Sequence, residues 1–262
     1  MSRDPALMRT FRVAKVTTHA PGLVSLYVEQ TYPITPGQFV NLWIPGVDER
    51  PFSVSDVKDG LVEISVKALG PFSRRLVEVR RHDWLGVRGP FGTGFTAAEH
   101  GLLVGGGIGV APLRFLDRVL AAQGLSRRLL FGVKSAAELI FPAAYAGTAE
   151  LWSDDGSLGE RGLVTQGLER ALAAAAPRVI YAAGPEPMLL AVLRLARAHQ
   201  IPAQLSFERA MKCGFGICGQ CCMDGAGLRV CVEGPVLTDL QLHQVTDLGL
   251  PRRGPSGRRL GA

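Results

Sequence analysis

The sequence lacks any apolar run long enough to cross a membrane, since a spanning helix needs about 20 consecutive apolar residues. Its first segment, Met1–Lys15, is too polar for a secretory signal peptide, so we expect a cytoplasmic protein whose thiols stay reduced. Aromatic residues make up only 7% of the 262 residues, and motifs of nucleic-acid-binding domains are absent. We therefore expect neither a membrane nor a nucleic acid as a partner.

Charge and histidine are also limited. The formal net charge of +6 suits phosphate-bearing cofactors and a partner surface, although a solvated basic surface without a binding role would have the same charge. The five histidines are scattered, and none stands in a metal-ligand or triad pattern. We therefore assign no catalytic acid or base.

Cysteine is equally rare, but all five cysteines lie between Met211 and Cys231. Four of them follow the pattern C-x4-C-x2-C-x9-C, and the first three have the spacing of a plant-type [2Fe-2S] loop. These candidate ligands are Cys213, Cys218, Cys221 and Cys231. Three glycines between them, Gly214, Gly216 and Gly219, allow positive φ and a close approach of backbone N–H groups to sulfur. A turn at residues 224–227 returns the chain to the fourth ligand as a hairpin would.

Two other uses of these cysteines were weighed. A structural zinc site also takes four cysteines, but usually as two C-x2-4-C pairs, which fits the spacing less well. Disulfides are a poor fit, because the count of cysteines is odd and the chain lacks a secretory signal. Cys222 directly follows Cys221, so only one of the two side chains can reach the cluster. The x2 spacing selects Cys221, and we predict that Cys222 is a small buried residue.

The first 98 residues are expected to form an antiparallel β-barrel, because short β-branched or aromatic runs alternate with Gly, Pro and Asp turns. The alternation of Val62, Ile64 and Val66 with polar residues is that of a half-buried strand. A short helix is expected at Ser73–Val79. The expected strands are Phe11–Thr17, Leu23–Val28, Phe39–Trp43, Phe52–Ser55, Val62–Lys67 and Trp84–Val87.

Two segments of this region could bind a cofactor. The run Arg50-Pro51-Phe52-Ser53 places an arginine and a flat ring on one strand, which suits a diphosphate and a planar ligand. The run from Lys67 to Ser73 ends a strand and begins a helix whose N–H groups could face a phosphate. Taken singly, the first could be an ordinary strand and Ser73 an ordinary helix cap.

Residues 99–207 alternate strands and helices, which predicts a doubly wound parallel α/β domain. Expected strands are Leu102–Val104, Arg128–Val133, Ala149–Trp152, Arg178–Ala182 and Gln204–Phe207; expected helices are one ending at Leu120, Leu163–Ala176 and Glu186–His199.

Two glycine-containing corners of this domain follow strands and open helices: GGGIG at 105–109 and Gly184-Pro185. They can flank one nucleotide crevice, although packing alone could also demand two tight turns. The first departs from G-x-G-x-x-G because residue 110 is valine. Lys134 and Ser135 could meet a 2′-phosphate or form a solvated turn. Residues 208–250 would hold the cluster, and 251–262, with Arg252, Arg253, Arg258 and Arg259, would be a mobile basic tail.

The order RPFS, GGGIGVAPL, YAAGPEPM resembles the ferredoxin–NADP reductase superfamily, in which a flavin-binding β-barrel precedes a nicotinamide-binding α/β domain. Together with ERAMKCGFGICGQC and RVCVEGPV, from Phe11 to about Leu240 the chain is similar to the electron-transfer subunits of class B dihydroorotate dehydrogenase. The resemblance implies FAD, a [2Fe-2S] cluster and NAD(H) as co-substrate. It implies FAD binding by Arg50, Pro51, Phe52, Ser53, Ser65, Val66, Lys67, Phe72 and Ser73. The NAD site would be shaped by Gly105, Gly106, Gly107, Gly109, Gly184 and Pro185.

The same resemblance implies a partner: an FMN-containing dihydroorotate dehydrogenase catalytic subunit, in a heterotetramer with two copies of each chain. Hydride carries two electrons whereas the cluster accepts one, so FAD is expected between NAD and the cluster. Similar cluster modules occur in NAD(P)H-linked subunits of sulfhydrogenases and anaerobic sulfite reductases, which are an alternative. A module that senses redox state through the cluster without turnover is another.

Overall fold

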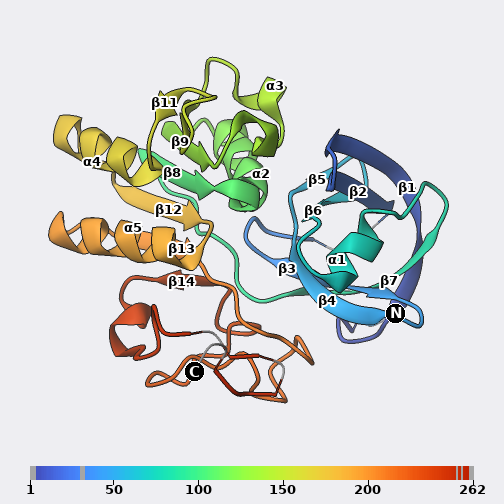
Figure 1. The fold of residues 1–262 in the computed structure, drawn as a ribbon. Coiled ribbons are helices and arrows are strands. Elements are labelled where there is room, and N and C mark those ends of the chain that lie inside the picture. Colours follow the sequence, from blue (N-terminus) through green and yellow to red (C-terminus); the bar gives the residue numbers. More distant parts are fainter. Residues whose placement is uncertain (1–3, 30–32, 252, 255, 260–262) are drawn as a thin grey trace.

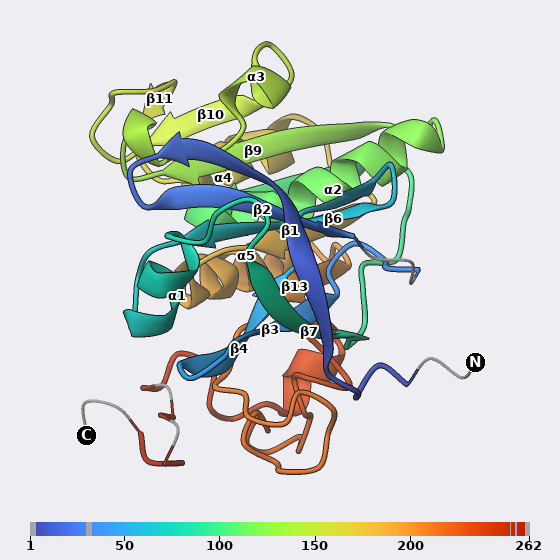
Figure 2. The same cartoon turned by 90° about the vertical axis from the view of Figure 1, so that its right-hand side faces the viewer.

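The computed structural model describes residues 4–29, 33–251, 253–254 and 256–259. Two seven-stranded sheets form two bodies, and the cysteine-rich segment lies below both of them in two perpendicular views (Figures 1 and 2). Among the described residues, no helix is both long and apolar enough to span a bilayer.

The N-terminal body is an antiparallel sheet with the strand order β4-β3-β7-β1-β2-β6-β5. Its two edge strands, β4 and β5, are consecutive in the chain, and the Ser55 N–H between them donates to the Glu63 carbonyl at 2.8 Å, which curls the sheet onto itself. Its strands are β1 (Arg9–Ala20), β2 (Leu23–Glu29), β3 (Phe39–Ile44), β4 (Asp48–Ser53), β5 (Asp56–Lys58), β6 (Leu61–Lys67) and β7 (Trp84–Phe91), with helix α1 (Pro71–Leu76) after β6.

The six expected strands are present, and Val62, Ile64 and Val66 of β6 lie in the buried core. β6 was expected to be half-buried, but Glu63 and Ser65 on its other face are also buried, because they pair with Arg114 and Ser55. Two further expectations for this body are corrected. Strand β5 was missed, because three residues carry too little pattern to detect. The helix begins at Pro71 rather than Ser73, since proline fits the first helical position, where its missing N–H costs nothing.

The second body is an α/β sheet with the order β11-β10-β9-β8-β12-β13-β14, parallel except for β14. Its two faces are covered separately: Leu102 and Val104 of β8 belong to the core under α4 and α5, whereas Leu103 packs with α2. This is the expected doubly wound arrangement. The strands are β8 (Gly101–Gly106), β9 (Arg127–Val133), β10 (Glu150–Ser153), β11 (Glu160–Arg161), β12 (Val179–Ala183), β13 (Ala203–Ser206) and β14 (Val236–Thr238). The helices are α2 (Val110–Ala122), α3 (Pro142–Tyr145), α4 (Val164–Ala174), α5 (Glu186–Ala198) and the short 3-10 turns η1 (Gly107–Gly109), η2 (Ala136–Glu138) and η3 (Gln241–Gln244).

The cysteine-rich segment is attached to the α/β body by β14, which pairs antiparallel with β13. Sequence patterns did not reveal β11 or β14, each of only two or three residues. Cys221, Met223, Val230 and Cys231 are buried in the same hydrophobic core as α5. The segment is therefore packed onto the α/β body, and the boundaries at 98, 207 and 250 remain predictions.

The C-terminal tail was expected to be mobile, and its described residues correct this. The guanidinium groups of Arg253 and Arg259 both bind the Asp224 carboxylate, at 2.7 and 2.9 Å. The Gln220 side-chain amide donates to the Gly254 carbonyl at 2.9 Å. The tail thus folds back onto the cysteine loop through pairings that sequence alone cannot show. Arg252 lies outside the described residues.

Ion pairs join the two bodies where α2 meets the β5–β6 hairpin. Arg114 binds Glu63 at 2.8 Å, and Arg118 binds Asp56 at 2.6 Å. Both carboxylates are only 5% exposed. Breaking a buried pair leaves an uncompensated charge, so these contacts resist separation of the two bodies.

Candidate cofactor and cluster sites

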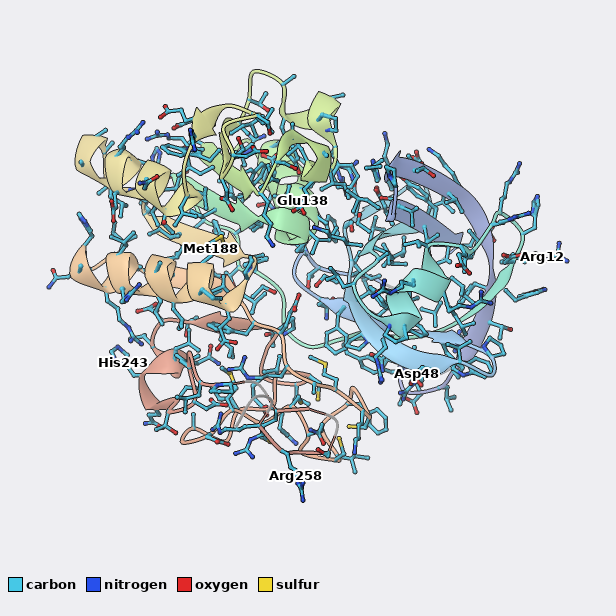
Figure 3. All side chains as sticks on the ribbon, in the orientation of Figure 1. Arg12, Asp48, Glu138, Met188, His243 and Arg258 are labelled. Carbon is cyan, nitrogen blue, oxygen red and sulfur yellow. The ribbon has the colours of Figure 1, made fainter. Side chains whose placement is uncertain are left out.

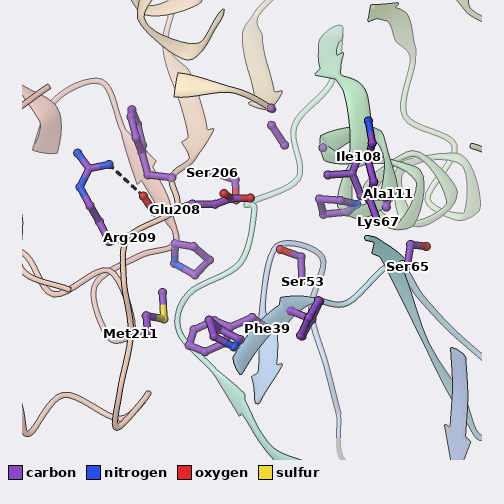
Figure 4. A pocket seen from close by; sticks show the side chains of 18 of the residues that line it. Phe39, Ser53, Ser65, Lys67, Ile108, Ala111, Ser206, Glu208, Arg209 and Met211 are labelled. Atoms are coloured by element: carbon purple, nitrogen blue, oxygen red, sulfur yellow. Dashed lines mark hydrogen bonds between the residues drawn. The ribbon is translucent and has the colours of Figure 1, made fainter. Parts of the chain in front are cut away.

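A cavity of about 240 Å³ opens between the two bodies (Figure 4). From the barrel, Pro51, Phe52 and Ser53 of β4 line it together with Ser65 and Lys67 of β6. From the α/β body it is lined by residues that include Gly109, Ala111, Gly184, Ser206, Glu208, Arg209 and Met211. The structure thus brings together most of the side chains predicted to bind FAD.

Four of the predicted FAD residues do not line this cavity. Arg50 is paired with Asp48 at 2.5 Å. The Val66 side chain is fully buried in the barrel core, and Phe72 is buried there with its ring 6.0 Å from that of Phe52. The Ser73 hydroxyl accepts hydrogen bonds from the backbone N–H groups of Leu69 and Gly70, each at 2.9 Å. Val66 and Phe72 could therefore meet a cofactor only through their backbone, and the Ser73 hydroxyl acts as a helix cap.

A second, larger cavity of about 1020 Å³ lies at the carboxyl ends of the α/β strands. Predicted residues lining it are Gly106, Gly107, Gly109, Gly184 and Pro185. Because β8 and β12 are neighbours and strand order reverses between them, this is the switch point at which open α/β sheets bind ligands. Lys134 and Asp154, at the ends of β9 and β10, also line it.

Packing accounts for glycine at three positions of the loop after β8: 105, 106 and 109. A Cβ on Gly105 would meet the Phe131 ring at 2.7 Å, and one on Gly106 would meet the Met188 sulfur at 2.6 Å. A Cβ on Gly109 would lie 2.6 Å from the Gly184 nitrogen. Gly105 lines neither cavity and is packed against Phe131 and Val110. The loops after β8 and β12 therefore touch each other, which brings both of their backbones to the same crevice.

The four predicted ligand cysteines are arranged as two pairs. The Cys218 N–H donates to the Cys213 sulfur at 3.5 Å, and the Cys231 N–H donates to the Cys221 sulfur at 3.4 Å. The three glycines of the loop have the expected positive φ: Gly214 at 82°, Gly216 at 88° and Gly219 at 68°. Cys222 is half-buried rather than buried, which corrects the expectation, because its neighbour Cys221 takes the inward-facing position.

The environment of these sulfurs favours a thiolate at Cys213 and at Cys221, one in each pair. Burial opposes ionisation of Cys213, but N–H groups of Cys218, Phe215 and Ile217 directed at its sulfur lower its pKa to about 6. A hydrogen bond from the Cys231 thiol lowers the pKa of Cys221 to about 7, against the effect of burial. The same hydrogen bond raises the pKa of Cys231, so the second pair shares one proton. Thiolates are the form that binds iron.

The donor set at this site consists of four cysteine sulfurs in two pairs. A [2Fe-2S] cluster takes four cysteine thiolates, and the donor set here supplies four sulfurs with backbone N–H groups around them. Cys213 and Cys218 would hold one side of the cluster and Cys221 and Cys231 the other.

Arg88 connects the first ligand to the barrel, a contact that sequence reasoning missed. Its guanidinium donates to the Cys213 carbonyl at 3.0 Å and binds the Glu49 carboxylate, which also accepts from Asn41 at 2.7 Å. It also lies 5.3 Å from the centre of the Phe215 ring. Glu49 belongs to β4, the strand that carries Pro51–Ser53. The cluster loop is thereby tied to the strand that lines the smaller cavity.

We expect Arg88→Met to loosen this connection. The Arg88 side chain is only 12% exposed, so its loss leaves Glu49 and the Cys213 carbonyl without their partner and costs about 1–3 kcal/mol. The measurements are the midpoint of thermal unfolding and the rate at which a chelator removes iron. Arg75→Met, which removes an exposed pair with Glu78, is the control and should change stability by less than about 1 kcal/mol. Equal effects of the two substitutions would contradict the role of Arg88.

A second network that sequence reasoning missed links the smaller cavity to the cysteine-rich segment. Arg209 binds Glu186, the first residue of α5, at 3.0 Å, and both side chains are buried. Glu186 also accepts from the Gly249 N–H at 3.2 Å. Nothing in the spacing of these residues indicates the network, because its members are far apart in the sequence.

Comparison with known proteins places this geometry in a family. Residues 208–243 match the family model described as the iron-sulfur cluster binding domain of dihydroorotate dehydrogenase B. The chain is 36% identical to a Methanocaldococcus jannaschii protein named as the probable NAD+-linked electron transfer subunit of that enzyme, covering 95% of this chain and 96% of the relative. The chain belongs to the family of dihydroorotate dehydrogenase B electron transfer subunits. A Methanothermobacter thermautotrophicus protein with the same name is 42% identical, and the match covers 87% of this chain and 86% of that relative.

Solved structures place the fold of this family member among flavin reductases. A chain of NADH-dependent reduced ferredoxin-NADP oxidoreductase, solved in a study of flavin-based electron bifurcation, matches with a TM-score of 0.81 and 25% identity, covering 90% of this chain and 89% of that one. A ferredoxin NADP+ reductase of Neisseria gonorrhoeae with bound FAD and NADP matches with a TM-score of 0.65 and 18% identity. The match covers 76% of this chain and 99% of that one. The expected fold, a barrel followed by an α/β domain with a C-terminal iron–sulfur module, is confirmed.

Proposed function

We propose that this chain carries electrons between NAD+ and a catalytic subunit. That subunit oxidises dihydroorotate at its FMN. FAD would occupy the smaller cavity, NAD(H) the larger one, and a [2Fe-2S] cluster would be held by Cys213, Cys218, Cys221 and Cys231. FAD, when bound, supplies the exchange between electron pairs, moved as hydride, and single electrons. The partner and both nucleotides come from the resemblance to the family and from the names of the relatives.

The observation that carries the proposal is the path of one segment. Ser206, Glu208, Arg209 and Met211 line the smaller cavity, and Cys213 follows two residues later. Two extended residues span about 7 Å at most, so the wall of the cavity runs directly into the cluster loop. A row of aromatic rings makes the same connection: Phe39 of the cavity lies 5.7 Å from Phe91, which lies 6.3 Å from Phe215 of the loop.

The residues of this chain position the reactants and exclude water. Pro51 and Phe52, which line the cavity, offer an apolar surface to a flat ring. The Ser53 hydroxyl is a polar group in the same cavity (Figure 4). Gly109 and Gly184 border both cavities, so their backbones lie where the two nucleotides would meet. Arg88 holds the loop of the first cluster ligand against the barrel.

The test is a reconstitution with the native partner. Dihydroorotate and NAD+ should yield NADH only when both subunits are present, and NADH should bleach the flavin of this chain alone. A co-purified partner that carries nickel or sirohaem and no FMN would instead indicate a hydrogenase or sulfite reductase. A flavin that NADH fails to bleach would favour a redox-sensing module.

A further inference from the structure

Lys67 occupies a position that its assignment to FAD does not explain, because it lines both cavities. It ends β6 of the barrel, and in Figure 4 it lies beside Ile108 and Ala111, on the opposite side of the cavity from Arg209 and Met211. Its ammonium binds the Glu138 carboxylate at 2.8 Å. Glu138 comes from η2 of the other body, at the side that faces the barrel (Figure 3), and it lines the larger cavity. The pair therefore crosses the opening between the two bodies.

This contact differs in burial from the pairs at the α2 end of the same interface. Lys67 and Glu138 are both partly exposed, at 29% and 28%; at the α2 end the two arginines are 26% and 43% exposed, but their carboxylate partners are only 5% exposed. A partly solvated pair is weak and exchanges partners easily, while taking the partner from a buried carboxylate is costly. The Arg114 and Arg118 contacts thus hold the two bodies together when the pair at the opening separates.

The ligand that can separate Lys67 from Glu138 is an anion. Lys67 borders the larger cavity together with Gly106, Gly107 and Gly109, whose backbone faces the same space. Lysine binds phosphate as a point charge, and glycine loops after parallel strands let a diphosphate approach the backbone. A carboxylate already bound to that lysine occupies the position that a phosphate needs.

We propose that Glu138 competes with the phosphates of the nicotinamide nucleotide for Lys67 and thereby sets the affinity of the larger cavity. The inference rests on the proposed binding of NAD(H) there. With no nucleotide bound, the Lys67–Glu138 pair holds the opening; the nucleotide diphosphate replaces the Glu138 carboxylate and leaves it to solvent. The apparent affinity is reduced by the fraction of molecules in which Lys67 is engaged with Glu138.

The test measures binding of ADP-ribose, which has the diphosphate but no nicotinamide, by calorimetry on the FAD- and cluster-loaded protein without turnover. Glu138→Gln should tighten binding about 3-fold, the size of a partly exposed ion pair. Lys67→Gln should weaken it about 10-fold, the size of one charge-assisted hydrogen bond. Adding Glu138→Gln to Lys67→Gln should change nothing further. Glu150→Gln is the matched control, because it removes an exposed acid of the same body that pairs with Arg128 and lines neither cavity.

Each other outcome has a distinct meaning. Unchanged or weaker binding by Glu138→Gln overturns the competition. Loss of FAD from Lys67→Gln, read from the flavin absorbance, assigns the lysine to FAD and overturns its role toward the second nucleotide. If Glu150→Gln tightens ADP-ribose binding as much as Glu138→Gln does, the effect comes from net charge alone, and the proposed competition is overturned. Failure of the unaltered protein to bind ADP-ribose overturns the proposed nucleotide site itself.

Discussion

Cys231→Ser is expected to yield a protein that keeps its flavin but assembles almost no iron–sulfur cluster. Cys231 is buried, and its sulfur is paired with that of Cys221 on one side of the site. A serine hydroxyl stays protonated where a thiolate is required. Loss of an outer-shell partner alone lowers metal affinity about 10- to 100-fold, so loss of a ligand should reduce cluster occupancy by more than about tenfold. Iron and sulfide analysis, with the EPR signal of the reduced protein, measures the effect.

The adjacent cysteines provide a matched pair of variants for this prediction. Cys221→Ser should behave as Cys231→Ser does, whereas Cys222→Ser should retain iron and the EPR signal, because Cys222 is half-exposed and outside the two thiol pairs. A protein that loses its cluster with Cys222→Ser and keeps it with Cys221→Ser would reverse the ligand assignment. Zinc without iron in the unaltered protein would reject the cluster altogether.

Gly109→Ala should impair the use of NADH more than any other single-methyl change in the glycine loop. The added Cβ would lie 2.5 Å from the Ala183 carbonyl carbon and 2.6 Å from the Gly184 nitrogen, both of which are backbone atoms that cannot rotate away. The loops after β8 and β12 must then separate. Displacements of about 1 Å at a reacting geometry can cost 100-fold in rate, so we expect at least about a tenfold loss in the rate of flavin reduction by NADH.

Gly107→Ala is the comparison for this variant. Gly107 has a φ of 55°, but a Cβ there meets nothing within 4 Å, so the cost is the left-handed backbone of about 1–2 kcal/mol without a collision. The cluster signal should stay normal in both variants, since neither glycine borders the cysteines. Gly107 lines only the larger cavity, so its variant should also keep its flavin, whereas Gly109 borders both cavities and the rate for its variant is expressed per bound flavin. If Gly109→Ala reduced flavin as fast as the unaltered protein, the contact between the two loops would have no role in hydride transfer.

The parts of the structure that sequence predicted are those encoded by local pattern. The alternation at Val62, Ile64 and Val66 indicated a strand, and the positive φ of Gly214, Gly216 and Gly219 followed from the cysteine spacing. The order of motifs then indicated the family and with it the fold.

The remaining features depend on pairings between distant residues. Arg88 contacts Cys213 across 125 positions of the sequence, and the whole cysteine loop lies between β13 and its partner strand β14. Tertiary packing also buries the side chains of two residues that the family resemblance implied for the FAD site: Val66 and Phe72 lie in the barrel core and do not line the cavity. The half-exposed position of Cys222 and the binding of the tail arginines to Asp224 also depend on contacts between residues that sequence patterns do not relate.

The pairing of β14 with β13 makes the chain after the last cysteine an edge of the α/β sheet, through the register pairs Gln204–Thr238, Leu205–Leu237 and Ser206–Val236. Arg88 ties the start of the same segment to the barrel. The cysteine-rich segment therefore spans both bodies. Excising it would leave β13 as a bare strand edge and would remove one of the links between the two halves.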